Sequence, residues 1–145
     1  MLPELNIKLN SLTLEELTKH FKLADLNLSR ITIESHASKV FQHAQLIEAW
    51  YNNILIGLIA VYMNDDINKT AYITHVYVYP AYRSKGIANK LLQKCIELVQ
   101  KKNYIAIGLE VDKNNLSALR LYKKHNFSIS EEKESNYLMH LKIIY

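Results

Sequence analysis

A basic turn with one glycine joins a strand-like segment to a helix-like segment near the middle of the chain. Arg83, Lys85 and Gly86 lie in this turn, between the Val- and Tyr-rich run 71–79 and the amphipathic run 87–101. The first N–H groups of a helix lack intrahelical partners and carry partial positive charge, so they stabilise a bound phosphate. Gly86 lets a ligand approach the backbone closely. The turn therefore predicts a phosphate site, although a lone glycine turn with solvated basic side chains is the simpler alternative.

A second stretch that could carry chemistry opens the next predicted helix, 116–125. Asn115 precedes this helix and can cap it through its side chain. Tyr122 lies on the helix, and its phenol can donate a proton to a leaving group. Tyr122 also belongs to an i, i+3, i+4, i+7 stripe that begins at Ala118. Packing in the core is therefore the alternative role of this tyrosine.

The order of these two patterns resembles the GNAT superfamily of N-acetyltransferases. In that family the acyl-CoA pyrophosphate binds a loop with Gln or Arg, two residues, Gly, one residue, then Gly or Ala. Arg83, Gly86 and Ala88 match this pattern, and 115–127 is similar to the family's Asn, Ala, Leu-Tyr, Gly-Phe helix. The resemblance covers about 54–127, whereas the residues before it match only in a generic helical way.

The resemblance implies that acetyl-CoA is the co-substrate and that its pantetheine arm enters between two splayed strands. A backbone N–H near Tyr77 would bind the thioester carbonyl as negative charge develops on its oxygen. Val76 and Val78 are also expected in the core of a central strand, and both roles are compatible because the cofactor contacts would come from the backbone. The expected cofactor-binding residues are Val76, Tyr77, Val78, Arg83, Ser84, Lys85, Gly86, Ile87, Ala88, Asn115 and Tyr122.

The chain departs from the family pattern at three positions. Ser84 stands where glycine is common, Ala88 replaces the last glycine of the loop, and Asn126 replaces the glycine before Phe127. Asparagine can adopt the left-handed conformation that a helix end often needs. Ser84 keeps its backbone N–H, and its hydroxyl could add a hydrogen bond to phosphate.

Acetyl transfer to an amine needs a deprotonated nitrogen and a proton source for the departing thiolate. By resemblance, Tyr122 is the predicted proton donor. Glu110 is the predicted base, acting through water, because alternation along the strand 104–111 places it beside the small residues Ala106 and Gly108. A solvated carboxylate at the end of a strand is the alternative for Glu110.

Thr74 and His75 lie on the neighbouring predicted strand, near the same level as the predicted base. His75 could titrate near neutral pH, although a lone histidine in a strand is more often structural. The loop and short helix before the first hairpin flank the cleft in similar proteins. The candidate acceptor-side residues are Arg30, Glu34, His36 and Tyr72.

Hydrophobic periodicity predicts an α/β fold around a mixed sheet. The resemblance adds that the sheet is mostly antiparallel, flanked by helices, and contains a splayed strand pair for acyl-CoA. Thr13 and Glu16 form a capping-box pattern, and Asn52 with Asn53 predicts a hairpin turn. The predicted strands are 5–9, 46–51, 54–63, 71–79, 104–111, 127–130 and 137–143, and the predicted helices are 14–24, 37–44, 87–101 and 116–125.

Composition predicts one domain over residues 1–145, since the chain has 145 residues, 49% of them hydrophobic. The net charge of +4 is scattered, which argues against a nucleic-acid partner. The longest apolar run, 54–63, is too short to span a membrane, and residues 1–10 lack a signal-peptide pattern. Cys95 is the lone cysteine and shares an apolar helical stripe, so we expect a buried structural thiol and a cytoplasmic protein.

The histidines and the cysteine show no zinc-type spacing, so neither a metal nor covalent catalysis is predicted. The predicted function is an acetyl-CoA-dependent N-acetyltransferase that acts by direct attack of a primary amine in a ternary complex. The acceptor could be a polyamine, an amino sugar, an amino acid or a protein amine, and homodimer formation stays open. The alternative function is a non-catalytic acyl-CoA-binding sensor or scaffold module.

Overall fold

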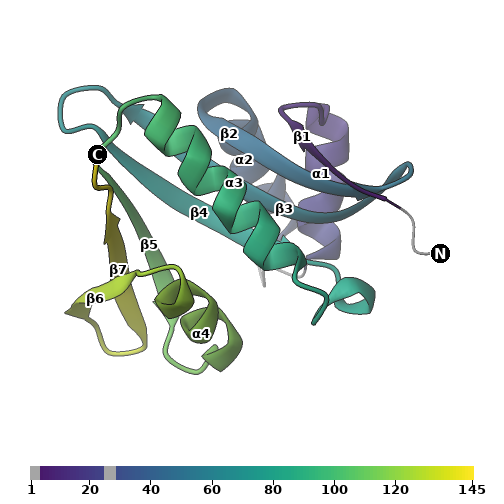
Figure 1. The fold of residues 1–145 in the computed structure, drawn as a ribbon. Coiled ribbons are helices and arrows are strands. Elements are labelled where there is room, and N and C mark those ends of the chain that lie inside the picture. Colours follow the sequence, from purple (N-terminus) through teal and green to yellow (C-terminus); the bar gives the residue numbers. More distant parts are fainter. Residues whose placement is uncertain (1–3, 25–28) are drawn as a thin grey trace.

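A mixed seven-stranded sheet in the order β1-β2-β3-β4-β5-β7-β6 carries helices on both faces (Figure 1). The computed structural model describes residues 4–24 and 29–145. Within these ranges β4 and β5 are the one parallel pair and every other neighbouring pair is antiparallel, which confirms the predicted sheet. The strands are β1 (Leu5–Leu9), β2 (Ala44–Tyr51), β3 (Ile54–Asp65), β4 (Thr70–Val78), β5 (Ala106–Asp112), β6 (Ser128–Glu132) and β7 (Asn136–Lys142). The helices are α1 (Leu14–Leu23), α2 (Arg30–His43), the 3₁₀ helix η1 (Pro80–Tyr82), α3 (Ile87–Lys101) and α4 (Leu116–Lys124).

Helix α1 begins with the capping box that the sequence predicts. The Thr13 hydroxyl accepts a hydrogen bond from the Glu16 N–H at 3.1 Å, and the Glu16 carboxylate accepts one from the Thr13 N–H at 2.9 Å. These two bonds satisfy backbone donors that the helix itself leaves without partners. Leu17 and Phe21 are fully buried, so the apolar stripe of α1 faces the sheet.

Helix α2 is longer than predicted, because it begins at Arg30 instead of residue 37. The Ser29 hydroxyl caps it by accepting a hydrogen bond from the Thr32 N–H at 3.2 Å. The first turn contains the β-branched residues Thr32 and Ile33, whose low helix propensity hides the start of the helix from a periodicity argument. The predicted start of this helix was therefore wrong. Ser29, the capping residue, is the sequence feature that marks the true start.

The β2–β3 hairpin turns at the predicted pair of asparagines. Asn52 adopts φ 52, a left-handed conformation that asparagine tolerates better than most residues. Strand β3 then runs on to Asp65, past the predicted end at residue 63. The side chain of Asp65 accepts a hydrogen bond from the Asn68 N–H at 2.9 Å, which forms a tight turn where the sequence predicted a loop over 64–69.

Helix α3 occupies the predicted residues and covers one face of the sheet, while α1 and α2 lie on the other (Figure 1). Leu91, Leu92 and Cys95 are fully buried against the sheet. Burial raises the pKa of the Cys95 thiol to about 12, as expected for a structural cysteine and not for a nucleophile. The two helical layers therefore hold the central strands β3 and β4 between two cores.

A buried carboxylate, Glu48 on β2, fixes the connection from β1 to α1. It accepts hydrogen bonds from the Ser11 N–H at 2.8 Å, the Leu12 N–H at 3.2 Å and the Trp50 indole N–H at 3.0 Å, and a further one from the Ser11 hydroxyl. A buried carboxylate is stable only with donors of this kind. Glu48 thereby sets the position of α1 over the sheet.

Candidate active site

The predicted phosphate-binding turn leads from β4 through η1 to α3. Gly86 is the residue that precedes α3, and it adopts φ 77. A Cβ atom at this position would meet no heavy atom within 4 Å, so the backbone there is open to a ligand. Ser84 also adopts a left-handed conformation, with φ 63. This explains why its position favours glycine, since a side chain there costs about 1–2 kcal/mol.

Arg83 ties the turn to the end of β4. Its Nε donates a hydrogen bond to the Val78 carbonyl at 2.8 Å, and its guanidinium lies 5.2 Å from the centre of the Tyr77 ring. Lys85, the other basic residue of the turn, has its ammonium 5.9 Å from the centre of the Tyr82 ring. Arg83 therefore positions the turn in addition to lending it positive charge.

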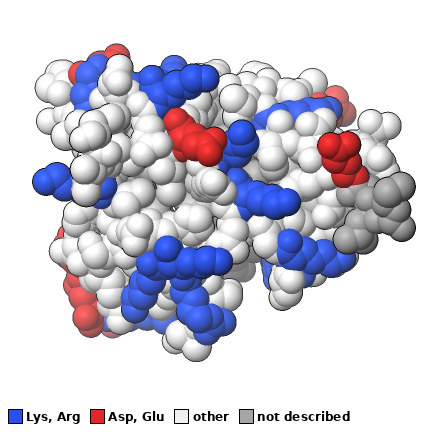
Figure 2. Space-filling model, in the orientation of Figure 1, with Lys and Arg blue, Asp and Glu red and all other residues white. Residues whose placement is uncertain are grey.

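A cavity of about 660 Å³ lies between this turn, β4 and α4. Lys85 does not line it, but the other predicted cofactor-binding residues do. The cavity also has two basic side chains that the sequence argument did not single out, Arg120 and Lys124 of α4. Figure 2 shows Lys and Arg side chains gathered over α4 and beside the turn before α3. The predicted residues that line it are Val76, Tyr77, Val78, Arg83, Ser84, Gly86, Ile87, Ala88, Asn115 and Tyr122.

The strands β4 and β5 splay apart, as predicted. They pair only from Thr70 to Ile73 of β4, and beyond this point they separate (Figure 1). The separation begins at a bulge, because the register of β4 against β3 shifts between Ala60 and Val61 and leaves Thr74 unpaired. The bulge turns the second half of β4 away from β5.

The register of β3 and β4 decides which backbone groups face the gap. The Tyr79 N–H donates to the Ile56 carbonyl at 2.9 Å, and hydrogen-bonded and non-hydrogen-bonded pairs alternate along an antiparallel ladder. Tyr77 therefore directs its N–H toward β3, whereas Val76 and Val78 direct theirs into the gap. The thioester donor expected near Tyr77 stays a prediction, and the ladder adds that the N–H groups of Val76 and Val78 are the ones near it that face the gap.

A smaller cavity of about 220 Å³ lies in the gap between β4 and β5. It shares Val76, Asn115 and Tyr122 with the larger cavity and also contains Glu110. Tyr122 is 6% exposed, and burial raises its pKa to about 12. Its phenol therefore stays protonated at neutral pH, so it can act as a proton donor.

Asn115 caps α4, as the sequence predicts. Its side-chain oxygen accepts a hydrogen bond from the Ala118 N–H at 3.2 Å and another from the Ser117 hydroxyl at 3.3 Å. The cap fixes the first turn of α4 beside both cavities. Tyr122, further along this helix, lies at the gap between β4 and β5.

Glu110 is exposed and has two partners that sequence reasoning missed. Asn136 Nδ2 donates to its carboxylate at 3.0 Å, and Lys133 Nζ lies 3.7 Å from the same oxygen. Burial and then the negative charge of Glu110 raise the pKa of Tyr72, which places this candidate acceptor-side tyrosine near the carboxylate. The β6–β7 hairpin therefore contributes to the surroundings of the candidate base.

His75 does not titrate near neutral pH, which agrees with the structural role that the sequence left open beside titration. Burial, followed by the charges of His20 and His36, lowers its pKa to about 3. Its ring lies against His20 of α1, which sequence reasoning also missed although it lies next to Phe21 on the buried face of the helix. Burial likewise lowers the pKa of His20 to about 4.

The other candidate acceptor-side residues lie on α2. The His36 ring is half-buried, with its centre 4.8 Å from that of Phe21. Glu34 lines a separate cavity of about 480 Å³ between α1 and α2. The side chain of Arg30 lies outside the described part of the chain. The structure thus brings Tyr72, and not Glu34, near Glu110.

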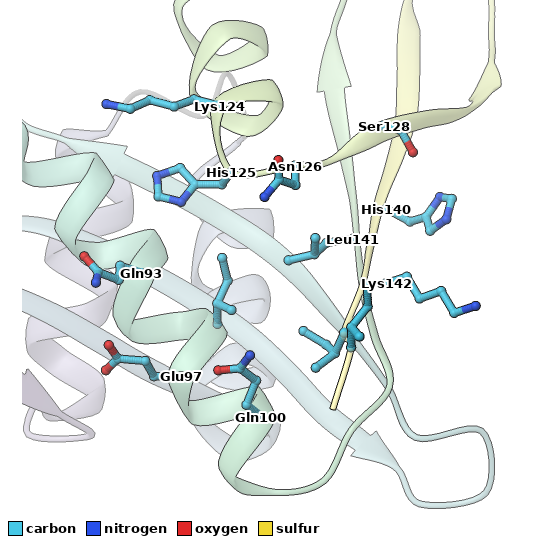
Figure 3. Close-up of a pocket in the computed structure, with 13 residues that line it drawn as sticks. Gln93, Glu97, Gln100, Lys124, His125, Asn126, Ser128, His140, Leu141 and Lys142 are labelled. Carbon is cyan, nitrogen blue, oxygen red and sulfur yellow. The ribbon is translucent and has the colours of Figure 1, made fainter.

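A further cavity, of about 920 Å³, lies away from this site, between α3, the end of α4 and β7. Figure 3 shows Gln93, Glu97 and Gln100 of α3 along one side of it. His125 Nε2 lies 3.0 Å from Asn89 Oδ1 and joins α4 to α3 between this cavity and the cavity beside the turn before α3. The cavity contains none of the predicted site residues.

The described residues contain no group of three or more His, Cys, Asp and Glu side chains that could hold a metal ion. Within the same ranges no helix is both long and apolar enough to cross a membrane.

The family model of the acetyltransferase (GNAT) family matches residues 10–127. The chain belongs to this family. Streptothricin acetyltransferase A of Bacillus subtilis (strain 168) is 30% identical over 111 residues, which are 77% of this chain and 58% of that protein. The probable N-acetyltransferase san of Drosophila melanogaster is 31% identical over 61% of this chain and 50% of that protein. The chain thus spans about half the length of these relatives.

Solved structures share the fold over nearly the whole chain. An acetyltransferase of Bacillus subtilis in complex with CoA superimposes with a TM-score of 0.79 at 19% identity, and the match covers 97% of this chain and 100% of that one. The likeness at this low sequence identity shows a shared fold.

Proposed function

We propose that the chain is an acetyl-CoA-dependent N-acetyltransferase that transfers an acetyl group to a primary amine by direct attack in a ternary complex. The observation that carries this proposal is the continuity of the site. The phosphate-binding turn, the gap between β4 and β5, and the buried Tyr122 follow one another along two cavities that share lining residues. Family membership and the fold shared with a CoA complex support the same function.

The turn and the splayed strands suit the two parts of acetyl-CoA. The N–H groups at the start of α3, with Arg83, Arg120 and Lys124 nearby, would hold the pyrophosphate. The backbone of Val76 and Val78 would bind the pantetheine arm as an added strand does. One of these N–H groups would also polarise the thioester carbonyl.

The chemistry needs a proton at the leaving sulfur and a neutral attacking nitrogen. Tyr122 would protonate the thiolate, because its high pKa keeps the phenol protonated until negative charge develops beside it. Glu110, across the gap, would take a proton from the amine through water. Tyr122 is nearly buried, and the cavity between the splayed strands is small. The reaction would therefore take place in a confined space that Tyr122 and Glu110 both line.

The role of Glu110 has a direct kinetic test. We expect Glu110→Gln to lower kcat/KM most at pH values where the acceptor amine is protonated, while acetyl-CoA affinity stays unchanged. Glutamine keeps an oxygen that can accept the Asn136 hydrogen bond, so the β6–β7 hairpin should stay in place. The measurement is a pH–rate profile.

Glu132→Gln is the matched control for this profile, because Glu132 is a surface carboxylate paired with Lys113 at 2.8 Å and lies outside both cavities. Parallel profiles for Glu110→Gln and the unmodified protein would show that Glu110 takes no part in deprotonation.

The acceptor can be found by screening. Purified protein with acetyl-CoA should release free CoA in the presence of one class of amine, among polyamines, amino sugars, amino acids and peptides with a free N-terminus or lysine. Acetylation of that amine is then measured by mass spectrometry. Binding of acetyl-CoA without release of CoA across the panel would instead favour a non-catalytic sensor or scaffold module.

We further propose that residues 1–145 act as one acetyltransferase domain in the cytoplasm, on a small-molecule or protein amine and without nucleic acid.

A further inference from the structure

A loose ion pair lies beside the small cavity between β4 and β5. Lys133 Nζ, on the β6–β7 turn, is 3.7 Å from Glu110 Oε1, the same oxygen that accepts the hydrogen bond from Asn136 Nδ2 at 3.0 Å. A charge-assisted hydrogen bond is about 2.8 Å long, so the two charges attract each other without a direct bond. Both side chains reach solvent, with 46% of Lys133 and 33% of Glu110 exposed. Such a pair is weak, so a charged ligand can replace it.

The turn that carries Lys133 is fixed relative to β5. The Lys133 N–H donates to the Asn136 carbonyl at 2.9 Å, and the Lys113 N–H donates to the Ser135 carbonyl at 3.0 Å. The second bond ties the turn to the segment that follows β5, and the pairing of β5 with β7 holds its other end. The backbone beneath the Lys133 ammonium is therefore fixed, and its side chain is the part that can adjust to a ligand.

Glu110 lies on the sheet face opposite to α3 and α4. Leu109 and Val111 belong to the core that these helices cover, and successive residues of a strand point to opposite faces. Glu110 and Tyr122 nevertheless line the same small cavity, so the gap between β4 and β5 connects the two faces. An acceptor that reaches the thioester from the Glu110 side would therefore pass the ion pair.

Apolar side chains lie next to the ion pair on the same face. Leu138 of β7 is opposite Glu110, and Tyr72 of β4 is opposite Gly108, two residues before it. Residues opposite one another in a sheet project to the same face. Gly108 has no side chain, and a Cβ atom there would lie 3.7 Å from Tyr72 Cδ2, so the tyrosine ring covers that position. Leu138 and Tyr72 thus give the charged groups an apolar border.

A positive and a negative charge this close together match the zwitterion of an α-amino acid. Its nitrogen and its carboxyl carbon are joined through one carbon atom and lie about 2.5 Å apart. The ammonium would face Glu110 Oε2, and the carboxylate would accept from Lys133, whose ammonium has three donors. The side chain of the amino acid would then cover Leu138 and Tyr72. A second ammonium in place of the carboxylate would instead be repelled by Lys133.

We propose that the acceptor is an α-amino acid with an apolar side chain, and that Lys133 recognises its carboxylate. The inference rests on the proposed acetyl transfer and names its substrate class. Lys133 binds the acceptor and keeps its own proton throughout, so it determines specificity and takes no part in the chemical step.

The proton balance of the reaction is unchanged by this assignment. The ammonium loses one proton to Glu110 through water, and the neutral nitrogen attacks the thioester carbon. As the C–S bond breaks, Tyr122 protonates the thiolate, and a second proton from nitrogen replaces through water the one that Tyr122 gives up. Glu110 then returns its proton to solvent. The net products are the N-acetyl amino acid, CoA and one proton.

Matched acceptors test the carboxylate. Leucine and leucinamide have the same side chain, but the amide has no carboxylate. We expect kcat/KM to be about tenfold or more higher for leucine, because a site that binds a polar group discriminates against an analogue without it. Intrinsic chemistry predicts the opposite order, since loss of the carboxylate lowers the pKa of the ammonium and leaves more neutral amine. Equal rates, or faster acetylation of leucinamide, would overturn the proposal and leave acetyl transfer intact.

Lys133→Met removes the charge and keeps the length of the side chain. We expect it to raise the KM for leucine about tenfold with little change in kcat, because the carboxylate is bound equally in the ground state and the transition state. Activity toward leucinamide should not fall, and Lys133→Arg should keep the preference for leucine. Lys113→Met is the matched control, since Lys113 is paired instead with Glu132, at 2.8 Å. An unchanged KM for leucine in Lys133→Met would overturn the proposal.

A binding measurement separates this inference from the proposed function. Calorimetry of leucine added to the protein with CoA, which has no acetyl group to transfer, should show binding that Lys133→Met weakens about tenfold. Such binding, without acetylation of any amine, would overturn acetyl transfer and support the recognition of amino acids by Lys133. Acetylation of other amines, without binding of leucine, would support acetyl transfer and overturn the amino-acid site.

Discussion

Replacement of Gly86 by glutamate is expected to weaken acetyl-CoA binding by roughly 10²-fold or more, because a carboxylate would lie where the start of α3 would otherwise stabilise the pyrophosphate. A Cβ atom at this position meets no heavy atom within 4 Å, so the variant loses about 1–2 kcal/mol to the strain of its positive φ and the fold should survive. Calorimetry measures the affinity, and circular dichroism checks the fold.

Gly86→Asn separates charge from backbone strain. Gly86 has φ 77, and asparagine adopts this conformation at lower cost than other side chains. We expect Gly86→Asn to keep most of the affinity. If the folded Gly86→Glu variant binds acetyl-CoA as tightly as the unmodified protein does, the turn does not bind the pyrophosphate.

Tyr122→Phe is expected to lower the turnover rate by roughly 10²-fold, the scale of general acid catalysis, while acetyl-CoA affinity and thermal stability change little. The ring and its contact with Phe127, at 5.8 Å between centres, remain in this variant. Only the proton donor is lost. Single-turnover kinetics, which isolate the chemical step, give the relevant rate.

Stability decides how the Tyr122→Phe result is interpreted. A large fall in melting temperature would show that the hydroxyl holds a buried structural bond, and the rate could not then be attributed to catalysis. An unchanged turnover rate in a stable variant would show that Tyr122 only packs in the core, and it would favour a non-catalytic acyl-CoA-binding module.

The segment from β4 through the turn to α3 was predictable because local rules determine it. A β-rich run, a glycine with positive φ and an amphipathic run each leave their own signature in the sequence. The phase of β4 against β3 leaves no such signature, since it depends on the bulge at Thr74. The sequence therefore places the donor only near Tyr77, whereas the ladder directs the N–H groups of Val76 and Val78 into the gap.

The environment of single titratable groups also escapes sequence reasoning. His75 alternates with apolar residues along a strand, and nothing local shows that His20, distant in sequence, lies 2.8 Å from it. Glu110 likewise meets Asn136 and Lys133 only through the pairing of β5 with β7 and the β6–β7 turn. Contacts between residues so far apart in the sequence form only when the whole sheet is assembled.

A crystal structure of the protein with acetyl-CoA would decide whether the turn and the gap form the cofactor site. We expect the pyrophosphate at the N–H groups that follow Gly86 and the pantetheine arm between β4 and β5. The N–H groups of Val76 and Val78 should lie about 2.9 Å from acceptor atoms of that arm or of the thioester. Acetyl-CoA bound elsewhere, such as in the cavity between α3 and β7, or a gap closed by pairing of β4 with β5, would show that this is not the cofactor site.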